Sequence, residues 1–189
     1  MSQNWAIRRA RWEDVTAICR QNAAMALETE EKVLDPGVLA AGVRGALEHP
    51  NHVRLWVAET IQASQTGNNL TITNPHSPAN DSDRIIGQAM TTPEWSDWRN
   101  GWVWWFQSVF VAQPWRGKGV FASLVNAICA DALDFSRREG VPVVGLRLYV
   151  ELENHTAQEV YRRLGFEDGC YQVMEMSAEK MAKRLKLAD

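Results

Sequence analysis

The stretch WVWWFQSVFV (Trp102–Val111), followed by AQPW (Ala112–Trp115) and RGKGVF (Arg116–Phe121), decides how this chain folds. Its first part is apolar on both faces, which is typical of a strand in the middle of a sheet with both sides covered. The polar pair Gln107 and Ser108 interrupts that strand and indicates a β-bulge or an edge that contacts a ligand. The last part predicts a glycine-bearing loop that opens a long helix.

This loop has the composition of an anion-binding site. Gly117 and Gly119 let the backbone approach a ligand closely and adopt positive φ. Free N–H groups there, with the N-terminus of the following helix, form a cradle for an anion, and Arg116 and Lys118 add positive charge. A pyrophosphate fits this arrangement. A strand-to-helix turn with solvated charges is the alternative, because neither common glycine fingerprint of nucleotide-binding proteins is present.

Composition places the chain among soluble globular proteins. Its 189 residues are the length of one domain, which buries about 70% of the surface of its unfolded chain. The net charge of -3 argues against a polybasic nucleic-acid binder. The chain shows no signal peptide and no run of membrane-spanning length, so we expect a cytoplasmic protein without nucleic-acid or membrane partners. No metal site is expected, since the three cysteines are scattered without paired spacing: Cys19, Cys129 and Cys170.

The rest of the chain alternates strands with helices, which predicts an α/β layered domain spanning residues 1–189. Strands are expected near residues 5–9, 53–61, 84–92, 102–111, 143–150 and 171–176. Helices are expected near residues 12–26, 36–48, 120–139 and 156–164. The polar segment 62–83 is expected to be a mobile loop with at most a short strand at 70–73, and the basic tail 178–189 a solvated helix.

Together these features resemble the GNAT superfamily of acetyl-CoA-dependent N-acetyltransferases. The resemblance covers the order of elements over nearly the whole chain and two motifs, Val109-Phe110-Val111…Pro114…Arg116-Gly117-Lys118-Gly119 and Asn154…Ala157…Tyr161…Leu164-Gly165-Phe166. The family's loop is Arg/Gln-x-x-Gly-x-Gly/Ala, so Arg116 and Gly119 match and Phe121 departs at the last position. The resemblance implies a mixed, mostly antiparallel sheet of six to seven strands, splayed at the central strand, with helices on both faces.

The resemblance also implies a reaction. The acetyl group of acetyl-CoA, the cosubstrate, would move directly onto a primary amine, with proximity and proton handling as the main catalytic effects and no cysteine or serine nucleophile. One backbone N–H of the central strand would hold the developing oxyanion. The residues expected to bind the cofactor are Val109, Phe110, Val111, Arg116, Gly117, Lys118, Gly119, Val120, Phe121, Asn154 and Ala157. Asn154 could equally serve only to cap its helix.

Two residues are expected to handle protons. Tyr161 matches the position from which the family commonly protonates the departing CoA thiolate; the alternative is a tyrosine in the core of an amphipathic helix. Several relatives place a carboxylate base inside the central strand, where this chain has Trp104-Trp105-Phe106-Gln107. Glu94 on the preceding hairpin is therefore selected as the base, ahead of Asp97, Glu151 and Glu153, although a base can also act through water.

Charge placement suggests a class of acceptor. The segment after the first helix and the hairpin at 93–101 should border the acceptor side, and they carry acidic residues such as Glu28 and Asp97. Trp95 and Trp98 could hold a cationic amine by cation–π contact, which favours a small cationic metabolite. The tryptophans could equally pack in the core or at a homodimer interface. Acetylation of a protein or peptide amine, a CoA-binding sensor without turnover, and a tryptophan-rich assembly protein remain as alternatives.

Overall fold

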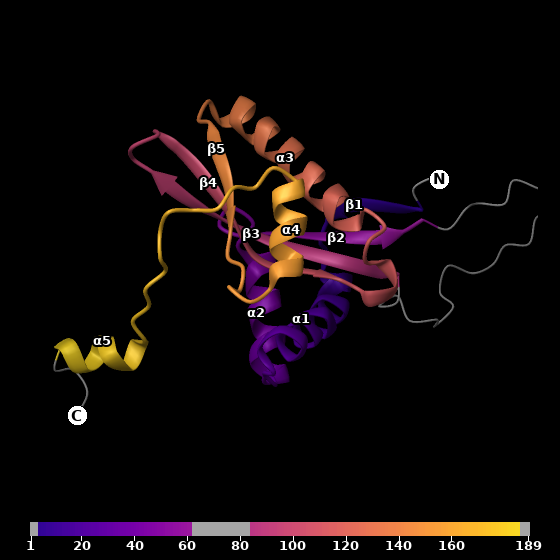
Figure 1. The fold of residues 1–189 in the computed structure, drawn as a ribbon, viewed down its shortest axis with the longest axis horizontal. Coiled ribbons are helices and arrows are strands. Elements are labelled where there is room, and N and C mark those ends of the chain that lie inside the picture. Colours follow the sequence, from indigo (N-terminus) through magenta and orange to yellow (C-terminus); the bar gives the residue numbers. More distant parts are fainter. Residues whose placement is uncertain (1–3, 62–83, 186–189) are drawn as a thin grey trace, which may run out of the picture. The chain divides into compact units, whose positions relative to one another are not determined.

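The computed structural model describes residues 4–61 and 84–185 (Figure 1). The chain divides into two compact units, Met1–Glu151 and Leu152–Asp189. The first unit contains the sheet and the longer helices, and the second contains two short helices. The segment 62–83, for which we expect a polar loop with a short strand at 70–73, lies outside the described residues.

The first unit is built on a five-stranded sheet in the order β1-β2-β3-β4-β5. Its strands are β1 (Trp5–Arg9), β2 (Arg54–Thr60), β3 (Ile85–Ser96), β4 (Gly101–Val111) and β5 (Val143–Leu148). The first three pairings are antiparallel, and β4 pairs with β5 in parallel. The sheet is therefore mixed and mostly antiparallel, as the resemblance to the GNAT superfamily implies.

The expected number of six to seven strands was too high for the described residues. The segment 171–176, expected as a last strand, forms no strand there, and Tyr171 and Met174 are 80% and 90% exposed. Alternating apolar residues give this segment strand propensity, but a strand forms only when a neighbour supplies the ladder hydrogen bonds. The segment has no such neighbour within its own unit.

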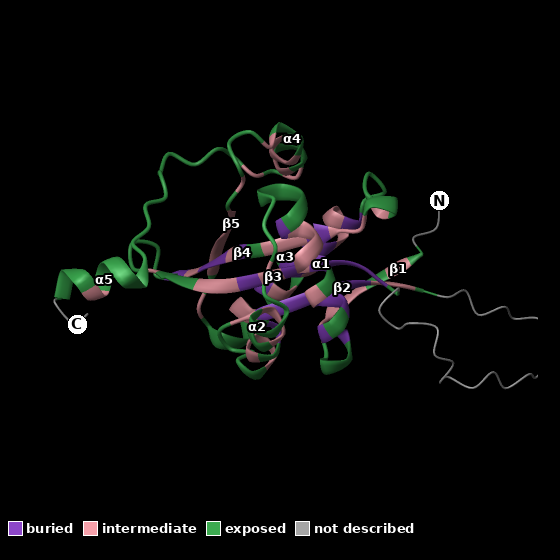
Figure 2. Cartoon of the chain, turned by 90° about the horizontal axis from the view of Figure 1, so that it is seen from below, coloured by how far each residue is buried: buried purple, intermediate pink, exposed green. Residues whose placement is uncertain are grey.

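Helices cover both faces of the sheet, which confirms the layered α/β prediction. The helices of the first unit are α1 (Val15–Glu30), α2 (Pro36–Glu48) and α3 (Val120–Glu139). Figure 1 shows α1 and α2 on one face and α3 on the other. Alternation along β2 fills both layers, since Leu55 and Val57 pack with α1 and α2 while Ala58 packs on the α3 side. The buried residues concentrate on β2, β3 and β4 between these layers (Figure 2).

Local signals in the sequence explain where two of these elements begin. The Asp35 carboxylate accepts a hydrogen bond of 2.8 Å from the Val38 N–H and Pro36 occupies the first turn, so α2 starts where this N-cap pair predicts. At the β3–β4 turn, Asn100 has φ 48°. A Cβ on Gly101 would lie 2.6 Å from the Pro142 carbonyl oxygen, so only glycine fits where β4 begins.

A partly buried ion pair ties β1 to the start of α1. Arg8 donates to both oxygens of Asp14, at 2.7 and 2.9 Å, and the Arg11 N–H donates to the same carboxylate at 2.7 Å. Asp14 is only 5% exposed. The hydrogen bond to Asp14 raises the pKa of Arg8 above its ordinary value. This bidentate pair fixes the entry of the chain into the first helix.

The second unit consists of α4 (His155–Arg163) and α5 (Ala178–Leu185) with the chain between them. The expected helix at 156–164 is thus present, shifted by one residue. The helix expected in the basic tail is present within the described residues. Neither helix contains a buried residue.

Candidate functional site

The parallel ladder between β4 and β5 ends before β4 does. The last register pair joins Phe106 to Leu148, and β4 continues through 107–111 with β3 as its partner on one side alone among the described residues. This divergence is the splay at the central strand that the resemblance to the GNAT superfamily implies. It leaves one edge of β4 open over its last five residues.

The backbone groups on this open edge belong to Val109 and Val111. The Ala112 N–H donates to the Ile86 carbonyl oxygen at 2.9 Å, so Ala112 points its donor toward the β3 side. Successive residues of a strand point their N–H and C=O groups to opposite edges. Val111 and Val109 therefore direct theirs away from β3, into the gap.

A β-bulge marks the point where the edge opens. Met90 pairs with Ser108 while the next residue, Thr91, pairs with Phe106, so Gln107 is an extra residue on β4. This confirms the bulge that the polar pair in the central strand predicts. A bulge bends its strand and increases the local twist.

The bulge also keeps the helix-facing side chains on one face. Before it, Phe106 meets the Phe121 ring of α3 with the ring centroids 6.4 Å apart. After it, Val111 packs on the same side against the cluster that contains Val120. Phe106 and Val111 are five positions apart, and in a regular strand an odd spacing places two side chains on opposite faces. The extra residue at the bulge shifts the alternation by one, so both side chains face α3.

The glycine loop beside the open edge adopts the backbone conformation expected of it. Gly117 has φ 72° and Gly119 has φ 90°, and a Cβ at either position would meet no atom within 4 Å. Glycine is therefore required there for its conformation and not for space. No side chain caps α3 within this described loop, and its first backbone bond runs from Ser123 to Gly119. The N–H groups of the first turn are thus available to an anion.

Arg116 connects the loop, the open edge and α1. Its Nε donates to the Val111 carbonyl oxygen at 2.9 Å, and its Nη2 donates to the Glu28 carboxylate at 2.6 Å. Its guanidinium lies 5.4 Å from the Phe110 ring centroid. Glu28, which charge placement assigns to the acceptor side, contacts the cation of the loop instead.

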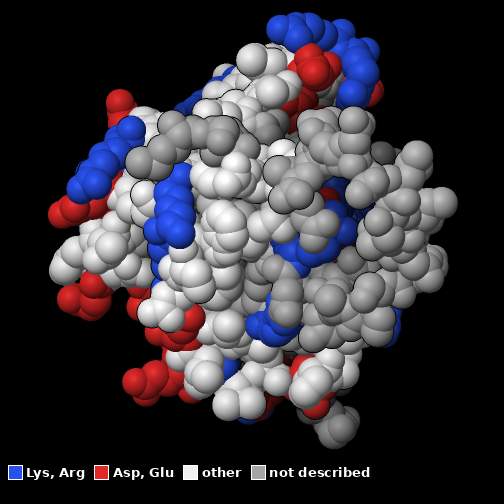
Figure 3. Space-filling view, turned by 90° about the vertical axis from the view of Figure 1, so that its right-hand side faces the viewer, with Lys and Arg blue, Asp and Glu red and all other residues white. Residues whose placement is uncertain are grey.

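Positive charge at the loop is local. The Lys118 ammonium lies 5.3 Å from the centroid of the Trp115 ring. On the face of the molecule drawn in Figure 3, basic side chains lie in several separate groups, some of them with acidic side chains beside them. Binding of an anion would therefore rely on these few charges and on the backbone N–H groups.

The tryptophans of the hairpin lie far from Glu28. Trp95 meets Trp102 edge to face at 5.0 Å, and Trp98 is 90% exposed. Asp97 accepts a hydrogen bond of 2.9 Å from the Trp98 N–H and so stabilises the turn. Trp102 and Val111 are nine positions apart on β4, or about 30 Å at 3.3 Å per residue. The structure does not bring together the four residues expected to bind the acceptor.

Glu94 belongs to a cluster of side chains at the branch between β4 and β5. Its carboxylate accepts one hydrogen bond of 2.6 Å from Trp105 Nε1 and another of 2.9 Å from Arg147 Nη1. The Trp105 ring stacks on Tyr149 with centroids 4.5 Å apart and an interplanar angle of 29°. Both oxygens of the expected base are thus engaged in hydrogen bonds.

Three members of this cluster are not among the site residues expected from the sequence: Trp105, Arg147 and Tyr149. Trp105 stands in an apolar run of the sequence, which predicts a core residue. Its indole nevertheless carries a polar N–H that needs a partner when packed. That N–H was the one available signal, since it pointed to an acceptor such as Glu94.

The second unit holds the remaining expected residues. The Asn154 side chain accepts a hydrogen bond of 3.0 Å from the Ala157 N–H and caps α4, which confirms the capping alternative. Tyr161 is half-buried and meets Phe166 edge to face at 6.0 Å. Burial raises the pKa of Tyr161 above its ordinary value. Roles of these residues toward a cofactor stay predictions.

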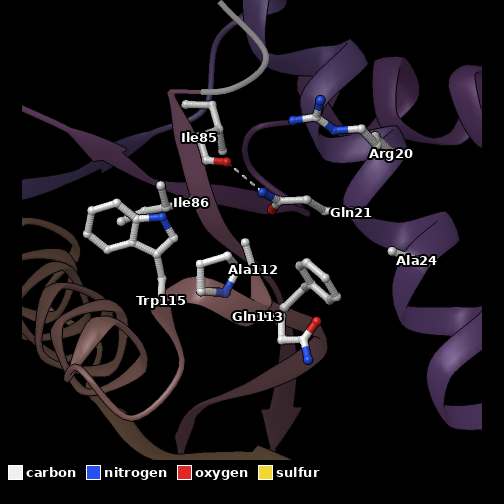
Figure 4. Close-up of a pocket in the computed structure, with 10 residues that line it drawn as sticks. Arg20, Gln21, Ala24, Ile85, Ile86, Ala112, Gln113 and Trp115 are labelled. Carbon is white, nitrogen blue, oxygen red and sulfur yellow. Dashed lines mark hydrogen bonds between the residues drawn. The ribbon is translucent and has the colours of Figure 1, made fainter.

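A cavity of about 440 Å³ lies on the β3 side of β4 (Figure 4). The α1 residues Arg20, Gln21 and Ala24 form one wall, and the chain around the ends of β3 and β4 forms the other. Gln21 extends from α1 toward β3, where its amide donates to the Ile85 carbonyl oxygen at 2.8 Å. The cavity is thus adjacent to the start of the glycine loop, and Phe110, from the last five residues of β4, also lines it.

Two kinds of feature are absent from residues 4–61 and 84–185. No group of three or more His, Cys, Asp or Glu side chains in these ranges could hold a metal ion. No helix within them is long and apolar enough to cross a membrane.

Comparison with known proteins gives consistent results. Residues 39–166 match the profile of the Acetyltransferase (GNAT) family. A possible acetyltransferase from Clostridium difficile 630 has a crystal structure with a TM-score of 0.72 and 33% identity, and the match covers 93% of this chain and 99% of that one.

More distant relatives share the fold. An integron cassette protein from the mobile metagenome of Vibrio cholerae matches with a TM-score of 0.70 and 16% identity over 98% of this chain and 99% of that one. AAC(6')-Iy in complex with a CoA bisubstrate analogue matches with a TM-score of 0.63 and 15% identity over 93% and 99%. An uncharacterised N-acetyltransferase of Methanocaldococcus jannaschii is 37% identical over 60 residues, which are 32% of this chain and 24% of that protein. The chain thus matches about a quarter of the length of this last relative.

Proposed function

Because the chain belongs to the GNAT acetyltransferase family, whose profile matches residues 39–166, we propose that it acetylates the primary amine of a small cationic molecule. Acetyl-CoA would be the donor, and transfer would be direct. The observation that carries this proposal is the open edge of β4 at 109–111 beside a loop whose two glycines have positive φ.

The residues present fit coenzyme A. The open edge offers the backbone groups of Val109 and the N–H of Val111 to an extended polar chain, as an added strand would use them, while the Val111 carbonyl oxygen already accepts from Arg116 Nε. The loop N–H groups and the uncapped start of α3 fit a pyrophosphate. Bound acetyl-CoA would supply an acetyl group activated as a thioester. Under this proposal, an N–H on the open edge stabilises the negative charge that develops on the acetyl oxygen.

Direct attack by the amine requires that the amine first lose its proton. The base role predicted for Glu94 would require the carboxylate to give up a hydrogen bond to Trp105 or Arg147. In the proposed reaction Glu94 keeps both bonds and holds these side chains in place. The amine then loses its proton to water, and the site contributes orientation.

Tyr161 is the proposed acid that returns a proton to the CoA thiolate. An acid must carry its proton at the working pH, and burial raises the pKa of Tyr161 above its ordinary value. The phenol is therefore in its acid form at neutral pH. This role rests on the position that Tyr161 shares with the family.

Two measurements on the full chain test the proposal. Calorimetry with CoA should show binding, and acetyl-CoA with a panel of amines should release free thiol faster than without amine. The panel contains simple monoamines, polyamines, an aminoglycoside and a peptide with a free N-terminus, since AAC(6')-Iy shares the fold.

The outcomes separate the candidate functions. Thiol release with small amines alone supports the proposal, and release only with the peptide would replace the small acceptor by a peptide. CoA binding without amine-dependent release would indicate a sensor. Absence of CoA binding by folded protein would refute the proposal altogether.

A further inference from the structure

The cluster at the branch of β4 and β5 is a connected unit of four side chains, Glu94, Trp105, Arg147 and Tyr149, called here the branch cluster. Glu94 holds Trp105 from one side and Arg147 from the other, and the Arg147 guanidinium lies 5.4 Å from the Trp105 ring centroid. Tyr149 stacks on Trp105. These contacts fix the orientation of both rings.

The branch cluster lies next to the open edge. Trp105 pairs with Arg147 one position before the ladder ends at Phe106 and Leu148. Val109 follows Trp105 by four residues, or about 13 Å along the strand. Tyr149 follows Leu148, the last residue of β5 that pairs with β4, so the stack of Trp105 and Tyr149 extends from the ladder toward the open edge. A molecule that touches the rings can therefore place an amine at Val109 through a chain of a few bonds.

The cluster carries no net charge. Glu94 and Arg147 form an ion pair with an N–O distance of 2.9 Å. Glu28, another carboxylate expected to attract cations, forms an ion pair with Arg116 at 2.6 Å. A polycation at the cluster would therefore meet the Arg147 guanidinium and find the Glu94 carboxylate already paired with it. The charges favour an acceptor whose only cation is the amine that reacts.

The exposed surface of the cluster is aromatic. Tyr149 is 53% exposed and ends the stack that begins at Trp105. Aromatic rings pair in offset-stacked or edge-to-face geometry with centroids 4.5–7 Å apart. A flat ring on the acceptor would continue the stack beyond Tyr149.

We propose that the branch cluster selects the acceptor, a monoamine with a flat uncharged ring joined to the amine by a short chain. The inference rests on the proposed function and narrows its substrate class. Tyr149 contacts the ring of the acceptor, and Glu94 acts as a positioning residue through Trp105 and Arg147. None of these residues takes part in the chemical step.

The first test compares 2-phenylethylamine, propylamine and spermidine as acceptors, using the wild type, Tyr149→Ala and the matched control Tyr149→Phe. Phenylethylamine should be preferred, and Tyr149→Ala should raise its KM by about tenfold with kcat within about twofold, since one aromatic pair is lost. Tyr149→Phe keeps the ring and should behave as the wild type. Propylamine has no ring and should respond to neither substitution.

A second measurement covers the case in which Tyr149→Ala folds poorly. 2-Phenylethanol has the ring without the amine, and it should inhibit the wild type competitively against phenylethylamine and not against acetyl-CoA. Preference for spermidine, an unchanged KM in Tyr149→Ala, or no competition by phenylethanol would overturn the inference while leaving the proposed function intact. Failure of every amine despite CoA binding would instead refute the proposed function.

Glu94→Gln tests the positioning role. The amide still accepts from Trp105 but loses the ion pair with Arg147, so KM for phenylethylamine should rise several-fold. The pH dependence of kcat should keep its shape, because no proton passes through Glu94. Loss of the acidic limb of that profile in Glu94→Gln would show that Glu94 is a base and would overturn its assignment here.

Discussion

Substitution of Gly119 by alanine tests the anion-binding loop most directly. Gly119 has φ 90°, and an added Cβ would meet no atom within 4 Å, so the substitution introduces conformational strain without a clash. The left-handed region costs an L-residue about 1–2 kcal/mol. This strain must appear either as lost stability of the free protein or as weaker CoA binding, depending on whether the loop keeps or leaves its conformation.

The two outcomes have measurable sizes. If the loop keeps its conformation, the melting temperature should fall by about 2–8 °C at this chain length. If it relaxes, the Kd for CoA should rise roughly 5- to 30-fold. The sum of the two free energies should equal about 1–2 kcal/mol in either case. Calorimetric titration with CoA and thermal unfolding of the same samples measure both quantities.

Gly140→Ala is the matched control. Gly140 ends α3 with φ 69° and also has no atom within 4 Å of an added Cβ. It should lose comparable stability and keep wild-type CoA affinity. Pantetheine, which lacks the pyrophosphate, should bind wild type and Gly119→Ala alike when the loop relaxes. If Gly119→Ala changed neither stability nor affinity, or if Gly140→Ala weakened CoA as much, the assignment of the loop would be wrong.

Three further predictions concern proton transfer and stability. Tyr161→Phe should lower kcat about 100-fold. Burial raises the pKa of Tyr161, and only the protonated phenol can donate a proton. The wild-type rate should therefore fall with rising pH only above about 10. Gly101→Ala brings a Cβ within 2.6 Å of a carbonyl oxygen and should lower the free energy of unfolding by about 1–3 kcal/mol. Gly42→Ala adds a Cβ in open space on α2 and should raise the free energy of unfolding by about 0.5–1 kcal/mol. Asp14→Ala leaves the partly buried Arg8 with Glu59 as its remaining ion-pair partner. The substitution should lower the free energy of unfolding, measured with urea, by about 1–3 kcal/mol.

Each of these has a result that contradicts it. A Tyr161→Phe enzyme with the wild-type rate and pH profile would remove the acid role. Equal stability of the Gly101→Ala and Gly42→Ala proteins would mean that the contact at the start of β4 is relieved without loss. A change below about 1 kcal/mol in Asp14→Ala would show that the ion pair behaves as a surface pair.

Features within one segment could be predicted from the sequence. The positive φ of Gly117 and Gly119, the bulge at Gln107 and the cap at Asn154 all follow from the conformations that these residue types allow. Such preferences depend on neighbours within a few positions. The glycine loop was therefore predicted in the conformation that the structure has.

Contacts between distant segments could not be predicted in the same way. Glu28 and Arg116 are 88 residues apart, and their ion pair forms only when α1 and the loop pack near the end of β4. Counting carboxylates near an expected acceptor site could not show that Glu28 and Glu94 were already paired. The partner of each charge depends on register and packing, which the residue pattern leaves open.

Gln107 matters for the fold as the extra residue of the bulge on β4, whatever its side chain. Its side chain is exposed, so most residue types should be accepted there. Shortening the chain by that one residue would straighten the strand yet leave Phe106 and Val109 facing α3, since they would then be two apart. Such a deletion should yield a folded protein whose central strand no longer diverges from β5. Among homologous sequences, we therefore expect many residue types at position 107. The number of residues between the last β4–β5 pair, at Phe106, and the glycine loop should stay constant.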